Sequence, residues 1–264
     1  MEPGELRRVA LRVAGETAAL LRDYMCDEGL SRVLEGETTL ADKMAEDYAI
    51  DVLRSEGIRA FIVSEELGVT GSGDIVALID PLDGSKNYLA CIPWAAVSIA
   101  FAKPRANSVS DVLAGAVAPV NRLPPFSFEK GGGCYHGGVR VTDRRSGIAE
   151  IVNVYVEHEE AVYKLAKLVR SWRRGVKIRS LGSASLELSY VALGTFTAFI
   201  DIRSKLRNID IAAAAGGIVE CNGFIASEDG GKIPFHADGV HRIGNIVAAR
   251  DKDTGLAIIK ALRD

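Results

Sequence analysis

The sequence predicts a layered α/β protein. Its second half alternates strand-like and helix-like segments, and its first half places two amphipathic helical segments before several mostly apolar strand-like runs. Hydrophobic residues make up 48% of the 264 residues, which is enough to bury a substantial core. Strands that alternate with helices imply a sheet with helices on both of its faces.

The first half is predicted to open with two helices. Between residues 5 and 24, apolar residues recur at helical spacing. A second apolar stripe covers residues 40–55, and Thr39 is placed to cap that helix. Asp42 lies in the first turn, where an acidic side chain is ordinarily a favourable partner of the helix dipole.

Strands dominate the rest of the first half. Apolar or alternating runs predict strands at residues 60–63, 74–79, 94–101, 112–120 and 126–130, and glycines at 131–133 then mark a hairpin. The stretch from Thr142 to Ala149 is polar. We therefore expect two units, an α+β half at residues 1–145 and an α/β half at residues 146–264.

The second half is predicted to form the α/β layer itself. Strands are expected at residues 151–156, 176–180, 197–202, 224–226 and 244–248, and helices at residues 159–171, 183–193, 210–221 and 252–262. The helix that begins near Asp210 is rich in alanine and glycine. Such small side chains let a helix approach a sheet closely.

The segment Asp80-Pro81-Leu82-Asp83-Gly84-Ser85 directly follows an apolar strand and brings two carboxylates to its end. Pro81 fixes φ and Gly84 permits a tight turn, so both acids can point to one place. Two close carboxylates repel each other unless a cation lies between them, and a hard divalent cation is the simplest solution. Free backbone N–H groups at the turn would suit a phosphate.

The same motif also occurs in structures that bind no phosphate. Most Asp-Pro and Asp-Gly pairs at strand ends are only turns. An EF-hand loop is excluded because Cys91 stands at the twelfth position from Asp80, where a bidentate glutamate is required. Phosphatases of the haloacid dehalogenase type carry their acids two positions apart, whereas these are three apart, which argues against that class.

Further charged residues follow other predicted strands. Glu65 and Glu66 end the strand at 60–63; adjacent acids there are usually solvated, but the nearby strand at 74–79 makes one of them a candidate third metal ligand. The basic cluster at residues 201–207 is equally explained as a solvated turn. For Asp210 the usual role is that of a helix cap, but the small residues behind it would bring that helix start deep into a cleft.

Composition narrows the classes of partner and compartment. A net charge of −3 gives no general reason to expect nucleic acid or an anionic membrane as a partner. The first residues lack the apolar core of a signal peptide and no later run is long enough to span a bilayer, so we expect a cytoplasmic protein. The four cysteines are scattered, which favours buried thiols over a disulfide framework or a zinc site.

Three segments, in this order and spacing, resemble the inositol monophosphatase and fructose-1,6-bisphosphatase superfamily of lithium-sensitive, magnesium-dependent phosphatases. They are Ser64-Glu65-Glu66, Asp80 to Ser85 with Asn87-Tyr88, and Asn208-Ile209-Asp210-Ile211-Ala212-Ala213. Residues 181–188, with Asp201-Ile202-Arg203 and Leu206-Arg207, look most like archaeal enzymes that accept both inositol phosphate and fructose bisphosphate. The resemblance spans nearly the full chain and implies a five-layer αβαβα sandwich of the sugar phosphatase type.

The resemblance also implies roles for single residues. Metal ligands would be the side chains of Glu65, Asp80, Asp83 and Asp210 and the carbonyl of Leu82. The catalytic group would be Asp42, Glu65 and Ser85, with Ser85, where the family usually has threonine, orienting the attacking water with Asp42. Substrate contacts would be Asp83, Gly84, Ser85, Arg179, Ala184, Asp201, Arg203 and Arg207. The first half would thus carry most metal ligands, and the second half the substrate contacts and the last ligand.

The implied activity is release of phosphate from inositol 1-phosphate, fructose 1,6-bisphosphate or both, by in-line attack of a metal-activated water. Two or three Mg²⁺ ions would be needed, with Mn²⁺ as a substitute. The implied assembly is a homodimer. Two alternatives stay open. A phosphatase acting on 3′-phosphoadenosine 5′-phosphate or NADP would need an aromatic platform, for which Tyr155, Tyr163, Tyr190 and Phe196 are candidates. A metal-binding regulatory protein without catalysis is the other.

Overall fold

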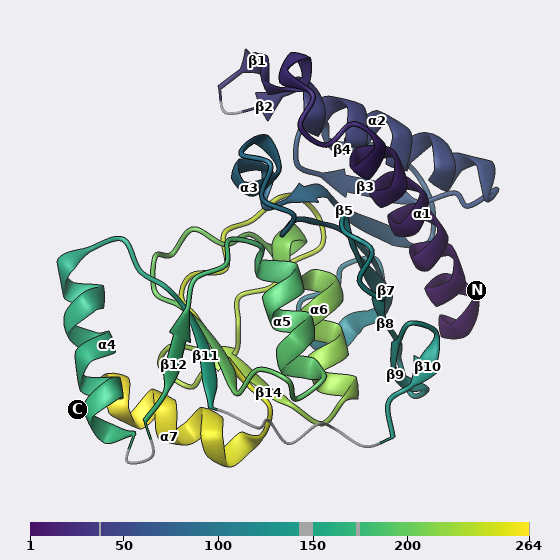
Figure 1. Ribbon diagram of the computed structural model, residues 1–264. Helices are drawn as coiled ribbons and strands as arrows, with labels where there is room; N and C mark the ends of the chain where they lie inside the picture. The colour runs from purple at the N-terminus through teal and green to yellow at the C-terminus, as the bar shows by residue number, and fades with distance from the viewer. Residues whose placement is uncertain (37, 143–149, 173–174, 264) are drawn as a thin grey trace.

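Two β-sheets are stacked between three layers of helices in the computed structural model, which describes residues 1–36, 38–142, 150–172 and 175–263 (Figure 1). The helices are α1 (Pro3–Asp23), α2 (Leu40–Ser55), α3 (Ser85–Leu89), α4 (Glu159–Ser171), α5 (Ala184–Ala192), α6 (Asn208–Glu220) and α7 (Lys252–Arg263). Helices α1 and α2 cover one face of the larger sheet, α5 and α6 lie between the sheets, and α4 and α7 cover the outer face of the smaller sheet. This order confirms the predicted five-layer sandwich.

The larger sheet has eight strands in the order β10-β9-β8-β7-β6-β5-β3-β4. The strands are β3 (Phe61–Ser64), β4 (Gly68–Gly71), β5 (Val76–Asp83), β6 (Ala96–Ala102), β7 (Val112–Pro119), β8 (Phe126–Glu129), β9 (Gly133–His136) and β10 (Val139–Arg140). Only β3 and β5 pair in parallel among these described strands, with Ser64 opposite Ile79. The carboxyl ends of β3 and β5 therefore lie side by side, as the sequence predicted.

Strand β5 runs further than the apolar pattern indicated. It was expected to end at Ile79, but its ladder with β6 continues to Asp83, with a register shift between Asp80 and Asp83. The Asp-Pro-Leu-Asp segment is therefore a bulged strand end rather than a free loop. A bulge re-aims side chains, and here it sits where the two acids leave the sheet.

The smaller sheet has five strands in the order β12-β11-β13-β15-β14. These are β11 (Ile151–Tyr155), β12 (Lys177–Arg179), β13 (Ala198–Asp201), β14 (Phe224–Ser227) and β15 (Ile246–Ala249). Strands β12, β11 and β13 are parallel, whereas β15 is antiparallel to both of its neighbours. Helices on both faces confirm the α/β layer expected for the second half.

The central layer depends on small side chains. Strand β6 sends Val97, Ile99 and Phe101 toward α1 and α2, and Ala96 and Ala100 toward the central helices.

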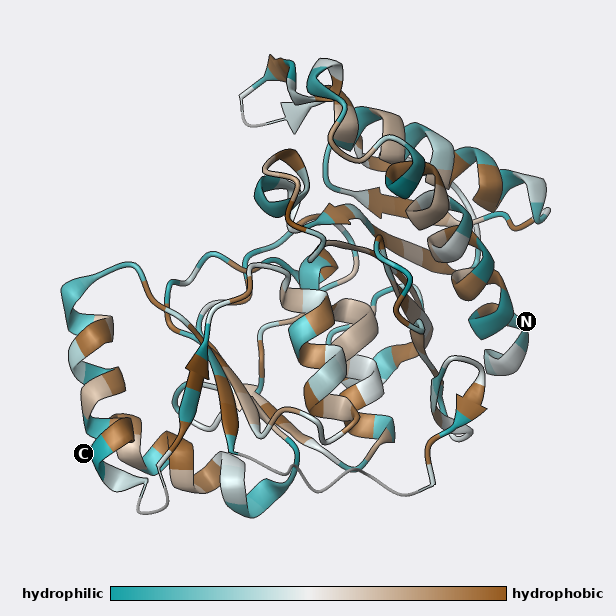
Figure 2. Cartoon of the chain, in the orientation of Figure 1, coloured by the Kyte–Doolittle hydropathy of each residue, from teal (hydrophilic) through white to brown (hydrophobic). Residues whose placement is uncertain are grey.

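Figure 2 shows apolar residues along the strands and both apolar and polar bands around α1, α2 and α4, as amphipathic surface helices require. Within the described ranges, no helix combines the length and the hydrophobicity needed to cross a lipid bilayer.

Several short elements were not predicted from the sequence. A small sheet of β1 (Val33–Glu35) and β2 (Thr38–Thr39) precedes α2, and neither strand carries an alternating apolar pattern. Strands β4 and β10 and the five-residue helix α3 were also not predicted. The polar boundary between the halves was expected at 142–149, and residues 143–149 lie outside the described part of the chain.

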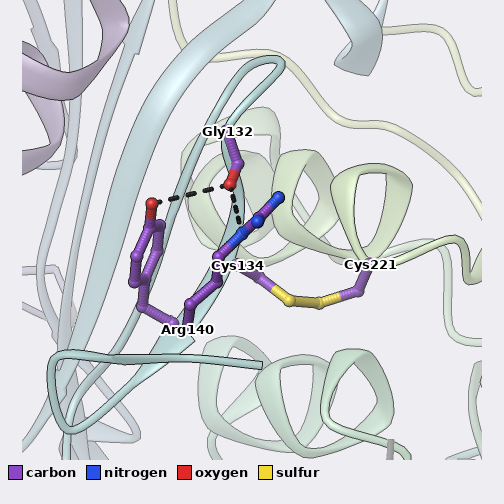
Figure 3. Close-up of a disulfide and its surroundings, with 5 residues drawn as sticks. Gly132, Cys134, Arg140 and Cys221 are labelled. Atoms are coloured by element: carbon purple, nitrogen blue, oxygen red, sulfur yellow. Dashed lines mark hydrogen bonds between the residues drawn. A yellow bond between two sulfur atoms is a disulfide. The ribbon is translucent and has the colours of Figure 1, made fainter. Parts of the chain in front are cut away.

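The expectation of four unpaired cysteines is wrong. The structure pairs Cys26 with Cys91 and Cys134 with Cys221, at Cα–Cα distances of 5.2 and 5.8 Å, within the range that a disulfide needs. Figure 3 shows the bond that joins Cys134 on β9 to Cys221 at the end of α6. The partners are 65 and 87 residues apart in the sequence, so spacing alone gave no sign of either pair.

Candidate active site

A cavity of about 740 Å³ opens where the ends of β3 and β5 face the segment between β13 and α6. Most of the predicted site residues line it, although they come from segments far apart in the sequence. They are Glu65, Asp80, Leu82, Asp83, Gly84, Ser85, Ala184, Arg203, Arg207 and Asp210. Asp42, Arg179 and Asp201 are not among its lining residues.

Asp80 is the most buried of the four acids predicted as metal ligands. Its side chain is 2% exposed, and its Oδ1 atom has no hydrogen-bond partner among the described residues. Burial raises the pKa of Asp80 well above its ordinary value, and the charges of Asp83, Glu65 and Asp210 raise that pKa further. The four carboxylates therefore interact with one another, and a positive charge among them would relieve their repulsion.

Asp83 is held by the first turn of α5. Its Oδ2 atom accepts hydrogen bonds from Ser183 Oγ (2.6 Å), Ser185 Oγ (2.6 Å) and Ser185 N (2.7 Å), and its Oδ1 atom accepts one from Ala184 N (3.2 Å). Burial raises the pKa of Asp83, although the hydroxyl donors oppose this shift. The second half of the chain thus fixes an acid of the first half.

Arg207 lies between two acids. Its Nη1 atom is 2.6 Å from Glu65 Oε1, and its Nη2 atom is 2.8 Å from Asp210 Oδ1. Asp210 also accepts the backbone N–H of Arg207, so it closes the start of α6 as a helix cap does. Burial raises the pKa of Asp210 to about 6 despite the opposing guanidinium. No three His, Cys, Asp or Glu side chains of the described residues converge tightly enough here to share an ion.

Asp42 lies at the start of α2, beside the cavity rather than on its wall. Its Oδ2 atom accepts hydrogen bonds from Thr39 N (2.8 Å) and Thr39 Oγ1 (2.7 Å), and its backbone N–H donates to Thr39 Oγ1 (3.4 Å), which confirms the predicted threonine cap. The side chain is 8% exposed, and burial raises its pKa, with a smaller contribution from the charge of Glu65. Asp42 therefore takes part in the cap of α2, and its catalytic role stays a prediction.

Arg203 is fixed by three neighbours. Its Nη2 atom is 2.6 Å from Oδ2 of the fully buried Asp201, and its Nη1 atom is 3.3 Å from Glu157 Oε1. Its guanidinium carbon lies 4.3 Å from the centre of the Tyr155 ring. Asp201 therefore holds Arg203 through an ion pair and is not itself among the residues that line the cavity.

The two remaining predicted substrate contacts differ. Ala184 lines the cavity and donates its N–H to Asp83. Arg179 is exposed on β12, and its Nη1 atom donates to the carbonyl of Ile178 at 2.8 Å. The structure therefore brings Ala184 into the site but does not bring Arg179 to the cavity wall.

Glu46 was missed at the level of sequence. It is fully buried on α2, and its Oε1 atom accepts hydrogen bonds from Glu66 N and Leu67 N, both at 3.1 Å, and from the Ser64 hydroxyl. It thereby holds the turn that carries Glu65. An acid four positions after Asp42 on a helix lies on the same face, which was the one available signal.

Glu187 was also missed. This buried residue of α5 accepts hydrogen bonds at Oε1 from the Tyr155 hydroxyl (2.5 Å), Leu181 N (3.1 Å) and Gly182 N (2.9 Å). Burial raises its pKa to about 7. No sequence pattern distinguished it from an ordinary helical glutamate.

Comparison with known proteins places this combination of fold and cavity among phosphatases. The chain belongs to the inositol monophosphatase family, whose model matches residues 2–264. An inositol-1-monophosphatase of Aeropyrum pernix is 48% identical over 254 residues, covering 94% of each chain. A fructose-1,6-bisphosphatase/inositol-1-monophosphatase of Archaeoglobus fulgidus is 30% identical over 262 residues, covering 96% of each.

Solved structures agree with this assignment. A crystal structure of an inositol monophosphatase-fructose 1,6-bisphosphatase superimposes with a TM-score of 0.79 at 28% identity, covering 96% of this chain and 98% of that one. A Pyrococcus horikoshii protein with similarities to inositol-1 monophosphatase gives a TM-score of 0.80 at 25% identity, covering 98% and 99%. These relatives support the archaeal dual-specificity type that the motifs indicated.

Proposed function

We propose that the protein hydrolyses inositol 1-phosphate and fructose 1,6-bisphosphate in a Mg²⁺-dependent reaction. The observation that carries this proposal is one cavity whose wall brings together Arg203, Arg207 and four carboxylates from three segments of the chain: Glu65, Asp80, Asp83 and Asp210. Carboxylates alone repel a phosphate ester, so cations are needed both to hold the acids together and to receive the phosphoryl oxygens. The arginines suit the rest of a phosphorylated substrate.

The oxygen donors of the cavity are of the kind that a hard divalent cation takes, although Arg207 lies between Glu65 and Asp210 here and no three acids converge among the described residues. Carboxylate and carbonyl oxygens are the ligands that Mg²⁺ prefers, and the buried Asp80 Oδ1 atom has no hydrogen-bond partner among the described residues. We assign as ligands the side chains of Glu65, Asp80, Asp83 and Asp210 and the Leu82 carbonyl, for two or three Mg²⁺ ions that Mn²⁺ can replace. Bound Mg²⁺ supplies a water of lowered pKa and stabilises the leaving oxygen.

The remaining residues orient the reactants. Ser85 and Asp42 would position the attacking water, and the N–H groups of Gly84 and Ser85 would hold the phosphate. Gly84 has a φ of 84°, and a Cβ atom there would lie 3.0 Å from the carbonyl oxygens of Gly182 and Trp94. Only glycine therefore lets the backbone reach this position, which supports a close approach to the phosphate.

Family membership alone extends the proposal to assembly and regulation. We expect a cytoplasmic homodimer that is inhibited by lithium, a small hard cation able to compete for oxygen ligands. We also propose that residues 1–145 and 146–264 act as two units. Two contacts between these units support this: Ser183 and Ser185 hold Asp83, and Arg207 holds Glu65. The site is therefore complete only when both units are in place.

A nucleotide phosphatase is not favoured. Tyr155 is the one aromatic residue among the described residues that line the cavity, and its ring is covered by Arg203. Tyr163 is exposed on α4, and Tyr190 packs against Trp94 and Phe196. No free aromatic platform for a purine therefore lies among these described wall residues.

A substrate panel tests the proposal. Released phosphate would be measured with inositol 1-phosphate, fructose 1,6-bisphosphate and 3′-phosphoadenosine 5′-phosphate, each with Mg²⁺ and with chelator. We expect turnover of the first two esters only when Mg²⁺ is present. Equal activity with chelator would refute the metal requirement, and a preference for the nucleotide would refute the substrate class.

Metal affinity should weaken in acid. Burial raises the pKa of Asp80, Asp83 and Asp210, to about 6 for Asp210, so a proton competes with a cation for the Asp210 carboxylate as the pH falls through about 6. One displaced proton weakens binding by about tenfold per pH unit below the pKa. Calorimetry with Mn²⁺ at pH 7.5 and 5.0 should show a Kd about tenfold higher at pH 5.0. A Kd constant across this range would contradict the ligand assignment.

A further inference from the structure

Glu187 connects two parts of the site through one oxygen atom. Its Oε1 atom receives the N–H groups of Leu181 and Gly182 and the hydroxyl of Tyr155, while its Oε2 atom is buried without a partner among the described residues. Taking a carboxylate out of water is unfavourable, and an apolar side chain is often the more stabilising choice. A buried acid with three donors on one oxygen therefore points to a positional requirement.

The first connection runs to the Asp83 corner. The turn held by Glu187 leads directly into Ser183, Ala184 and Ser185, which donate to Asp83. Gly182 also lies against Gly84, as the 3.0 Å distance from its carbonyl oxygen to a Cβ atom built on Gly84 shows. A shift of this turn would therefore move the donors to Asp83 and the wall beside Gly84 together.

The second connection runs to Arg203. Tyr155 ends β11, and its hydroxyl donates to Glu187 while its ring lies under the Arg203 guanidinium. Arg203 is also bonded to Asp201 on the neighbouring strand β13. The hydroxyl bond restrains the ring, and the ring contacts the guanidinium that lies 4.3 Å over its centre.

We propose that Glu187 and Tyr155 are positioning residues that set the distance between the Arg203 guanidinium and the Asp83–Gly84 corner. This inference rests on the proposed function, in which that corner holds the reacting phosphate and Arg203 holds the rest of the substrate. The pair thereby determines which phosphate esters span the two points. Neither side chain touches the reacting atoms in this role.

Tyr155→Phe separates positioning from packing, because it keeps the ring under Arg203 and removes only the hydroxyl bond to Glu187. We expect KM for fructose 1,6-bisphosphate to rise about tenfold, the size of one hydrogen bond to a charged group, with kcat within about twofold of wild type. Mn²⁺ affinity, measured by calorimetry, should stay unchanged because Asp83 keeps its donors.

Tyr135→Phe is the matched control. Tyr135 on β9 also donates to a glutamate, Glu129 (2.9 Å), and also lies under an arginine, Arg7, at 3.9 Å, but it is not among the residues lining the cavity. It should leave KM unchanged. An equal KM rise in both variants, or a lowered melting temperature without a KM change in Tyr155→Phe, would overturn the proposal.

Glu187 variants test the other connection. Glu187→Leu removes the acceptor of the turn, so we expect faster amide hydrogen exchange at residues 181–183 and Mn²⁺ binding weakened about 10- to 100-fold, as for other residues that support metal ligands. Glu187→Gln keeps an acceptor oxygen and should restore both measurements to within about threefold of wild type. Unchanged exchange and Mn²⁺ affinity in Glu187→Leu would refute the role of Glu187. Inactivity of the wild-type protein on every ester would instead refute the proposed function. The exchange data would then still decide whether Glu187 holds the turn at residues 181–183.

Discussion

Asp210→Asn is expected to lower kcat/KM for Mg²⁺-dependent phosphate release by about three orders of magnitude or more. Asp210 is a proposed metal ligand, and metal ions in such sites supply several kcal/mol of transition-state stabilisation, with each 1.4 kcal/mol worth a factor of about ten in rate. Asparagine has nearly the same shape but carries no charge, so it is a weaker ligand than aspartate for Mg²⁺.

The fold should survive this change. The amide oxygen of the new side chain can still accept the N–H of Arg207 that closes the start of α6, and one buried like charge is removed from beside Asp80. Arg207 loses the charge of one ion-pair partner while Asp80 loses a repelling neighbour, so the two effects oppose each other and the melting temperature without metal should stay close to that of wild type. Phosphate release, Mn²⁺ calorimetry and thermal unfolding would be measured in parallel. Asp51→Asn, at an exposed position of α2, is the control and should leave all three unchanged. Substantial turnover by folded Asp210→Asn would remove Asp210 from the metal site.

Elements with a strong apolar period could be predicted from the sequence almost to the residue. Helix α2 and helix α4 have the expected bounds, because each carries a clear stripe between polar ends. The bulged end of β5 could not be predicted, because its pairing with β6 depends on a neighbour strand rather than on its own apolar residues. The β1–β2 pair is short and has no alternating apolar pattern, so its sequence contained no strand signal.

The site divides in the same way. The four acids and Arg203 could be found because they end predicted elements within recognisable motifs. Glu46 and Glu187 could not, and Tyr155 was considered only as an aromatic platform for a purine, since each acts through contacts that only the fold creates; Tyr155 and Glu187 are 32 residues apart. Arg207 and Glu65 form an ion pair although they are 142 positions apart in the sequence. The spacing of the cysteines likewise did not indicate either disulfide. Sequence motifs thus identify the residues that line the cavity better than the residues that hold them in place.

Gly216→Ala should be strongly destabilising although it replaces a helical glycine with the best helix former. A Cβ atom at this position of α6 would lie 2.3 Å from Cζ of Phe128 on β8, and Phe128 is 1% exposed, so its ring has no free space to move into. Overpacking of this kind costs about 1–3 kcal/mol. The close approach of α6 to the larger sheet, which its small residues permit, would be lost.

Gly15→Ala on α1 is the matched comparison, because nothing lies within 4 Å of a Cβ atom there. It should stabilise the protein by about 0.5–1 kcal/mol through helix propensity alone. Urea unfolding of both variants would measure the two changes in the free energy of unfolding. In thermal unfolding, each change of 1 kcal/mol should move the melting temperature by about 2–4 °C. Phe128→Leu combined with Gly216→Ala should recover part of the loss, since the two residues share one contact. If Gly216→Ala were as stabilising as Gly15→Ala, α6 would not pack against β8 as closely as the structure shows, and the start of α6 at Asp210 would lose the support that places it in the cavity.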